Sequence, residues 1–298
     1  MPNAIEFTQS IVNGISVGLI YGLVGIGFCV IYNASGIVNF AQGVFVMLGG
    51  MVCQALLTSL GIPLILAVVL TIPLVALSGL LMEVAIVRPM MNRGATLFAI
   101  ILATLAAQIM VERITLLTLG DRPRTYEEFT SGGPLKLGDV AIGYQLFWIL
   151  GCGALLVLAL WLFFTRTRSG RALRACSQNR EAAQLLGIPV ARMMLLAFGL
   201  SAALGAIAGI LVTPTQYTAY NVGTPFGVNG FIAAIIGGFG RAGGALAGGL
   251  LLGVLQALAI VVLGAGFKNV AALSVLLLVL LLFPNGIFAG FGPNAKAH

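Results

Sequence analysis

Six of the fifteen lysine and arginine residues of this chain lie in the short segment 166–192, which holds a single acid, Glu181. These are Arg166, Arg168, Arg171, Arg174, Arg180 and Arg192. The middle of the segment reads Arg180-Glu181-Ala182-Ala183-Gln184-Leu185-Leu186-Gly187, which predicts a short helix that ends at the glycine. Guanidinium groups keep their charge at physiological pH, so we interpret this segment as a functional element exposed to water.

A second group of polar side chains stands at or within long apolar runs. Its members are Asn39, Gln42, Gln108, Asn229 and Arg241. Burying a polar group without a partner is costly, so each side chain must contact either a passing solute or another part of the protein. We take the five as candidates for the lining of a solute path, with a helix cap or a hydrogen bond between helices as the alternative role. A cation at Arg241 would favour an anionic group.

The sequence lacks the residue sets that catalysis or nucleotide binding would need. Segment 238–243 matches GxGxxG, but its flanks are apolar helical runs and not the strand and βαβ unit that the dinucleotide fingerprint requires. No G-x-x-x-x-G-K-[ST], HExxH or GxSxG occurs, and the single histidine is His298. We therefore predict that the chain is not an enzyme and carries no metal or cofactor of its own.

Composition indicates a polytopic integral membrane protein. Of the 298 residues, 60% are hydrophobic and only 8% are charged, and the mean hydropathy is +1.10. A soluble chain carries about 25% charged residues. The net charge of +7 then belongs to loops between spans and gives no indication of nucleic acid.

The apolar runs predict an all-α fold with eight membrane-spanning elements, each about 20 residues long. Seven simple spans are predicted at 11–31, 40–60, 64–84, 97–117, 146–164, 193–212 and 270–288. The run 231–263 is too long for one crossing and contains a glycine-rich stretch at 237–244, so we predict a half-helix, a break and a full helix there. Asn229 would then precede the half-helix, whose N-terminus could attract a carboxylate.

Basic residues in the short loops set the orientation. Segment 166–192 has six bases and one acid, whereas segment 120–143 has three bases and four acids, and one span separates them. We therefore place 166–192 in the cytoplasm and 120–143 outside. Counting back along the spans puts the turn with Arg88 and Arg93 inside and the N-terminus outside.

The pattern Glu181-Ala182-Ala183, three residues, then Gly187 resembles the EAA loop of ATP-binding-cassette importer permeases, in which a short cytoplasmic helix docks on a separate ATPase. Further segments, in order along residues 10–290, resemble the LivH-type permeases for branched-chain amino acids. They are 36–43 (GIVNFAQG), 87–89 (VRP), 171–176 (RALRAC), 236–249 (IGGFGRAGGALAGG) and 284–288 (PNGIF). Two departures are Pro189, after the turn that follows the EAA pattern, and Arg241.

The resemblance implies that residues 1–298 form a single transmembrane permease domain with 166–192 as its cytoplasmic coupling loop. It implies four kinds of partner around this chain: a second, related permease subunit, two cytoplasmic ATPase subunits that bind ATP and magnesium, a soluble periplasmic substrate-binding protein, and the lipid bilayer. The expected location is a bacterial inner membrane, with multiple passes and a periplasmic N-terminus. The residues expected to couple to the ATPase are Arg180, Glu181, Ala182, Ala183 and Gly187.

Three alternatives stay open at this level. The same machinery could carry urea, short amides or small carboxylates instead of hydrophobic amino acids. A stand-alone channel or ion-coupled carrier is disfavoured, because Glu83, Glu112 and Arg113 stand near predicted span ends and leave the middle of the membrane without a clear proton-binding residue. A membrane scaffold would transport nothing at all.

Overall fold

The computed structural model describes residues 4–130, 132–137 and 140–288. Eight of its helical segments are long and apolar enough to cross a membrane, which confirms the predicted polytopic, helical fold. They are α1 (Ala4–Ser35), α2 (Gln42–Ser59), α3 (Leu64–Met82) with its continuation, α5 (Leu97–Leu119), α6 (Tyr144–Arg166), α9 (Val190–Gln216), α11 (Ala242–Leu263) and α12 (Lys268–Leu282). A shorter apolar helix, α10 (Gly223–Gly237), precedes α11.

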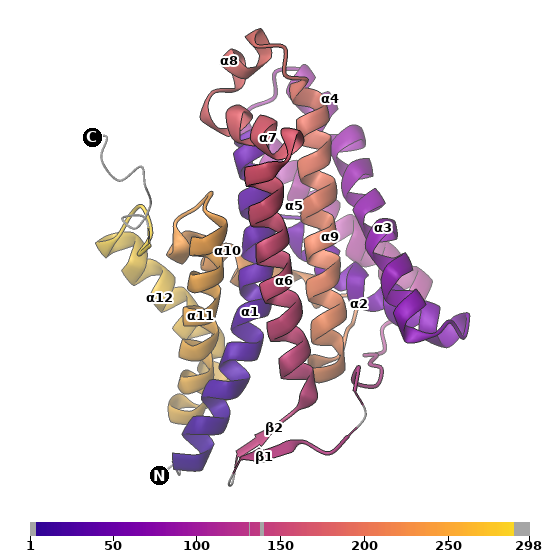
Figure 1. Cartoon of the computed structure of the whole chain (residues 1–298), viewed down its shortest axis with the longest axis vertical. Coiled ribbons are helices and arrows are strands. Elements are labelled where there is room, and N and C mark those ends of the chain that lie inside the picture. Colours follow the sequence, from indigo (N-terminus) through magenta and orange to yellow (C-terminus); the bar gives the residue numbers. More distant parts are fainter. Residues whose placement is uncertain (1–3, 131, 138–139, 289–298) are drawn as a thin grey trace.

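The two ends of the bundle carry different elements (Figure 1). At one end, here called the arginine end, lie α4 (Arg88–Asn92), α7 (Arg168–Gln178) and α8 (Arg180–Leu185). At the other, here called the loop end, lie the start of α1 and two short strands, β1 (Leu135–Leu137) and β2 (Val140–Ile142). The structure thus confirms that segments 166–192 and 120–143 lie on opposite sides of the bundle.

Helix α1 is the central element of the bundle. It packs against α9, α10 and α11, and most of its second half is buried. Gly14, Gly18 and Gly22 allow α11 to approach closely, because a Cβ atom added at Gly18 would lie only 2.7 Å from the Gly249 carbonyl oxygen. The glycines spaced four apart therefore serve helix packing within the chain.

The broken element has the predicted form but a different start. Helix α10 begins at Gly223, not at residue 231, and the backbone of 238–241 separates it from α11. The stretch before 231 looks like a loop because of its glycines and Pro225, yet a proline is tolerated in the first turn of a helix. Gly223 and Gly227 also fit closely against Gly43 of α2. The prediction that Asn229 precedes the half-helix was wrong.

Two other span ends differ from the predictions. The third span continues past residue 84 through a π-helical turn, η1 (Glu83–Val87), and then α4. Within this continuation the fully buried Glu83 carboxylate is paired with Arg88 at 2.7 Å. The last span ends at Leu282 and not at residue 288. The chain beyond it turns back onto the break, where the Ile287 amide donates to the Ile236 carbonyl at 2.9 Å.

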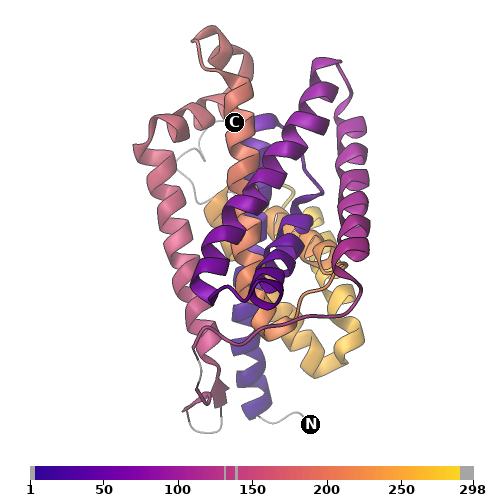
Figure 2. The same cartoon turned by 90° about the vertical axis from the view of Figure 1, so that its right-hand side faces the viewer.

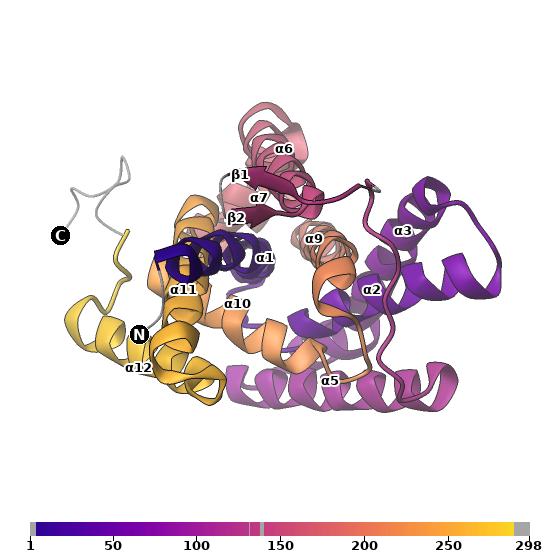
Figure 3. The same ribbon diagram turned by 90° about the horizontal axis from the view of Figure 1, so that it is seen from below.

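The loop end is covered by the connection between α5 and α6, which runs across the bottom of the bundle (Figures 2 and 3). It is held by the Tyr126 hydroxyl, which donates to the Ile210 carbonyl at 2.6 Å, and by a bridge between Arg124 and Thr218. The paired strands β1 and β2 were not predicted; they are three residues each and leave the fold essentially helical. Gln9 ties the start of α1 to β2 through two hydrogen bonds with the Ala141 backbone.

Candidate coupling helices and solute pocket

Helices α7 and α8 are fixed at the arginine end by side-chain caps. The Thr167 hydroxyl accepts a hydrogen bond from the Gly170 amide at 2.9 Å and starts α7, and the Asn179 side chain accepts one from the Ala182 amide at 2.9 Å and starts α8. Helix α7 packs against α1, α6 and α9, and its Leu173 side chain is buried. This helix pair is therefore in direct packing contact with the central helices of the bundle.

The five predicted coupling residues lie together in α8 and the turn after it, but they face different ways. Glu181 and Ala182 are exposed, whereas Ala183 is 2% exposed and faces the protein core. The Arg180 guanidinium points back to the Met194 sulfur at 3.1 Å. Gly187 has φ +80°, a left-handed conformation that ends the helix as predicted.

Leu185 and Leu186 are functional candidates that the sequence reasoning missed. The two residues are 90% and 81% exposed. Both lie in the connection between the candidate spans α6 and α9 and so belong to neither span. The available indication in the sequence was the pair of adjacent leucines within the arginine-rich segment 166–192.

Cys176 and Ser177 of α7 face the end of α1 across a recess of about 250 Å³. Tyr32, Asn33 and Gly36 form the wall on the α1 side. Burial raises the pKa of the Cys176 thiol, and the nearby Arg180 charge opposes this shift in part. Cys176 is therefore a weakly reactive thiol at neutral pH.

Two of the predicted path residues are buried in the middle of the bundle. Gln42 is fully buried, donates to the Ser201 carbonyl at 3.1 Å and accepts from the Ser201 hydroxyl at 2.6 Å. Asn39 is also fully buried, and its side-chain oxygen accepts from the Ala41 amide at 3.1 Å at the start of α2. The contacts of Gln42 match the alternative role of a hydrogen bond between helices. Asn39 bonds only the amide of the residue before α2, and among the described residues its buried side-chain nitrogen has no hydrogen-bond partner.

Gln108 and Arg241 lie at separate places: Gln108 is 7% exposed and packs between helices, whereas Arg241 is exposed. Gln108 of α5 donates to the Thr224 hydroxyl of α10 at 2.6 Å and to the Glu112 carboxylate at 3.2 Å. Thr224 in turn donates to Glu112 at 2.8 Å, which gives a small polar cluster between the two helices. Arg241 is exposed in the break before α11, and its guanidinium reaches the Phe288 carbonyl at 3.4 Å.

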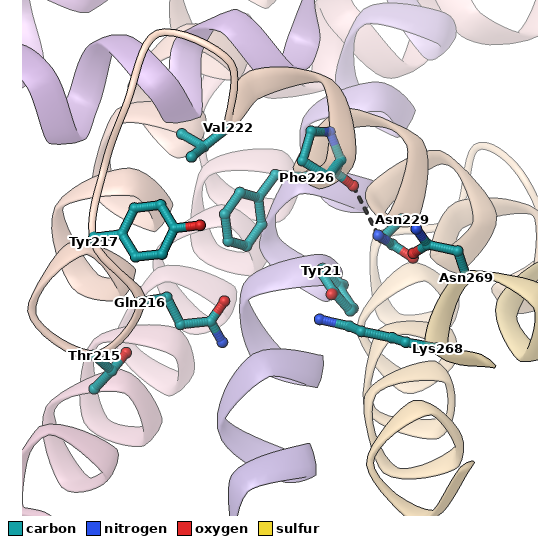
Figure 4. Close-up of a pocket in the computed structure, with 10 residues that line it drawn as sticks. Tyr21, Thr215, Gln216, Tyr217, Val222, Phe226, Asn229, Lys268 and Asn269 are labelled. Carbon is teal, nitrogen blue, oxygen red and sulfur yellow. Dashed lines mark hydrogen bonds between the residues drawn. The ribbon is translucent and has the colours of Figure 1, made fainter. Parts of the chain in front are cut away.

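A cavity of about 410 Å³ lies between α1, the end of α9, α10 and the start of α12 (Figure 4). It is lined by Tyr21, Thr215, Gln216, Tyr217, Val222, Pro225, Phe226, Asn229, Lys268 and Asn269. Asn229 is the predicted path residue that lines it, and sequence reasoning missed the others. Lys268 gave no specific signal in the sequence, because lysines at the ends of apolar spans commonly extend to the membrane interface.

Asn229 supports one wall of this cavity. Its side chain donates to the Pro225 carbonyl at 2.8 Å and accepts from Gln256 of α11 at 2.7 Å, and it is 5% exposed. A smaller cavity of about 270 Å³ shares Pro225, Asn229 and Asn269 with it and extends along α10 and α12. The two cavities together form a recess on this side of α10.

These features define a multi-pass membrane protein with a solute-sized recess between its helices and a capped helix pair at its arginine end. Residues 10–284 match the family model described as the permease component of branched-chain amino acid transport systems, and the chain belongs to that family. The match contains seven of the eight candidate spans completely and the first span from residue 10 onward.

Named relatives cover the chain almost end to end. It is 33% identical to the high-affinity branched-chain amino acid transport system permease protein BraD of Pseudomonas aeruginosa, over 96% of this chain and 97% of the relative. It is also 33% identical to the corresponding protein LivH of Escherichia coli, over 94% of this chain and 95% of that one. A probable LivH of the archaeon Methanocaldococcus jannaschii is 29% identical over 89% of this chain and 87% of the relative.

The fold is similar to that of one chain in a solved complex, PsaBC from Streptococcus pneumoniae with an antibody fragment. The TM-score is 0.50 with 14% sequence identity, and the similarity covers 95% of this chain and 93% of the other. At this identity the comparison concerns the arrangement of helices alone.

Proposed function

We propose that this chain is a permease subunit of an ATP-binding-cassette importer for branched-chain or other hydrophobic amino acids. It would work in a bacterial inner membrane beside a second, related permease, with the loop end facing the periplasm. Two cytoplasmic ATPases would bind ATP and magnesium, and a soluble receptor would deliver the amino acid. The chain itself would catalyse no reaction.

One observation carries this proposal: the same two helices reach both candidate sites. α1 and α9 contact α7 at the arginine end, and they contribute Tyr21, Thr215 and Gln216 to the cavity. A partner that moves α8 would therefore change the walls of the cavity through packed helices. Two-state motion of packed elements is the usual way in which a distant event opens or closes a site.

The test is reconstitution of the chain with its partner permease, both ATPases and the soluble receptor in lipid vesicles. We expect ATP-dependent uptake of leucine, isoleucine or valine, and no uptake when the ATPases are omitted. Uptake without ATPases would indicate a channel or carrier. ATP-driven uptake of urea, an amide or a small carboxylate, with no uptake of amino acids, would contradict the proposed cargo.

Gly187 offers a test of the coupling role of α8. A Gly187→Val variant should hydrolyse ATP with little uptake, because a β-branched residue does not tolerate φ +80° and the helix end would be distorted. Gly187→Asn is the matched control, since asparagine adopts this conformation readily and no atom lies within 4 Å of the added Cβ position. Equal uptake by both variants would contradict the coupling role.

A further inference from the structure

The cavity of Figure 4 carries one cation and no acid. Lys268 reaches into it from the first residue of α12, with its ammonium group directed toward Tyr21 and Gln216. Among the ten lining residues there is no aspartate or glutamate. Within the part of the chain that the structure describes, the Lys268 ammonium has no ion pair. The cavity therefore presents a positive charge that no carboxylate of the described lining balances, which favours binding of an anionic group.

Other polar side chains around Lys268 are also free to bind. Across the described residues, no hydrogen bond engages the side chains of Tyr21, Gln216, Tyr217 or Asn269, and in Figure 4 their polar ends turn into the cavity or toward its rim. Asn229 differs, because its amide already bonds to Pro225 and Gln256. The unengaged groups supply hydroxyl and amide donors that an oxyanion could accept from.

The backbone at the same place is strained. Tyr217 has φ +56°, and within the described residues it is the one non-glycine residue with positive φ. This conformation stops α9 and turns the Tyr217 ring toward the cavity, with its side chain 55% exposed. Residues held in such conformations concentrate at ligand sites, where the rest of the structure maintains them.

The opposite wall is apolar. Val222, Pro225 and Phe226 line it, and the Phe226 ring packs against that of Tyr21 at 6.0 Å between centroids. A cavity of about 410 Å³ is large enough for a small organic solute. The shape therefore suits a molecule with a carboxylate at one end and a short hydrocarbon part at the other.

We infer that this cavity is a binding site for the carboxylate of the transported solute, with Lys268 as the residue that pairs with it and the Val222, Pro225 and Phe226 wall as the contact for the aliphatic side chain. The inference rests on the proposed function and adds to it a place and a binding residue. The site recognises the carboxylate and not the amine, because it presents a cation and no acid.

Direct protection of the lysine tests the inference without any uptake assay. The purified importer is treated with an amine-acylating reagent, and modification of Lys268 is followed by mass spectrometry in the presence of leucine, 4-methylpentanoate or leucinamide. We expect the two carboxylates to slow modification of Lys268 and leucinamide to have no effect. Equal protection by all three, or by none, would overturn the inference. If protection of Lys268 increases with the phospholipid content of the sample, the site binds a lipid headgroup, and this result would also overturn the inference.

Uptake by variants provides the second test. Lys268→Gln should reduce ATP-driven leucine uptake about tenfold or more, since a lost charge-assisted hydrogen bond has effects of that size, whereas Lys268→Arg keeps most of it. Arg122→Gln removes the same charge from an exposed position outside the cavity and should leave uptake unchanged. Normal uptake by Lys268→Gln would overturn the inference, while absence of ATP-driven uptake by the unmodified importer would instead contradict the proposed function.

Discussion

At the residue scale, the exposed Leu185 and Leu186 at the end of α8 form the surface of the arginine end to which we expect a partner to bind. Leu185 and Leu186 present 90% and 81% of their surface, in a segment whose other side chains are mostly polar. Each would gain about 1.5–3 kcal/mol on full burial. Their exposure makes physical sense if another protein covers them, and the predicted coupling residues Glu181 and Ala182 lie beside them.

Replacing both leucines should weaken ATPase binding. We expect a Leu185→Asp, Leu186→Asp variant to retain less than about a tenth of the ATPase that copurifies with the unmodified chain, because the apolar contact is lost. Gln184→Asp adds a charge to an exposed position on the same helix without removing apolar surface, and it should copurify normally. A normal ATPase yield from the double variant would show that α8 docks by another surface.

The ion pair between Glu83 and Arg88 should matter for stability. Glu83 is fully buried, and two hydrogen bonds of 3.0 and 2.7 Å join it to the Arg88 guanidinium. Arg88→Met should destabilise the protein by about 3 kcal/mol or more, because it leaves a buried carboxylate without its counter-ion. The double variant Glu83→Gln, Arg88→Met should recover part of the loss in thermal unfolding experiments. No recovery would mean that Arg88 acts through other contacts.

At the element scale, the fold depends on helices that approach one another through glycine. α1 lies in the centre, and its Gly14, Gly18 and Gly22 meet α11 at backbone distance. Apolar surface alone does not drive helices together in lipid, so such close contacts supply much of the packing energy. The break after α10 uses the same device, because an added Cβ at Gly237 would lie against the Gly244 backbone.

A larger side chain at Gly18 should separate α1 from α11. We expect Gly18→Val to lower stability by about 3 kcal/mol, because the added atoms would overlap the Gly249 and Leu250 backbone. Gly151→Val in α6 is the matched control: it is also a helical glycine, and no atom lies within 4 Å of its Cβ position. Thermal unfolding of the purified proteins measures both, and equal midpoints would contradict the packing role of Gly18.

At the scale of the whole molecule, the two ends of the bundle are built from different elements. The capped helices α7 and α8 occupy one end, and the N-terminus and the β1–β2 hairpin occupy the other, as Figures 1 and 2 show. The cavity with Lys268 is lined by the last residues of α9 and the first residues of α10 and α12. α1 and α9 run between the two ends and both pack against α7 at the arginine end.

Labelling from the two sides of the membrane tests the orientation. A Glu181→Cys thiol should react with a membrane-impermeant maleimide from the cytoplasmic side alone, and an Arg122→Cys thiol from the periplasmic side alone. The native Cys176 should react slowly at pH 7, because burial raises its pKa and little thiolate is present; its rate should rise as the pH is raised. Labelling of Glu181→Cys from the periplasm would reverse the proposed orientation.

Sequence alone was sufficient to predict the membrane class, the number of spans, the helix that ends at Gly187, the opposite placement of segments 166–192 and 120–143, and the resemblance that the family match confirms. These features depend on local composition and on the charge of short loops, and both can be taken from the sequence without knowledge of the tertiary structure. The start of α10 was misplaced because Gly223, Pro225 and Gly227 resemble a loop until Gly43 is brought against them.

The cavity with Lys268 is formed only by the tertiary structure. Tyr21, Gln216, Tyr217 and Lys268 come from three separate helices or their ends, and no spacing along the chain links them. Likewise Asn39 and Gln42, polar residues beside apolar sequence, look equally suited to a path and to a core until their partners are seen. A polar side chain in a membrane protein must bond to something, but the sequence does not tell whether the partner is protein or solute, because that depends on which helices meet.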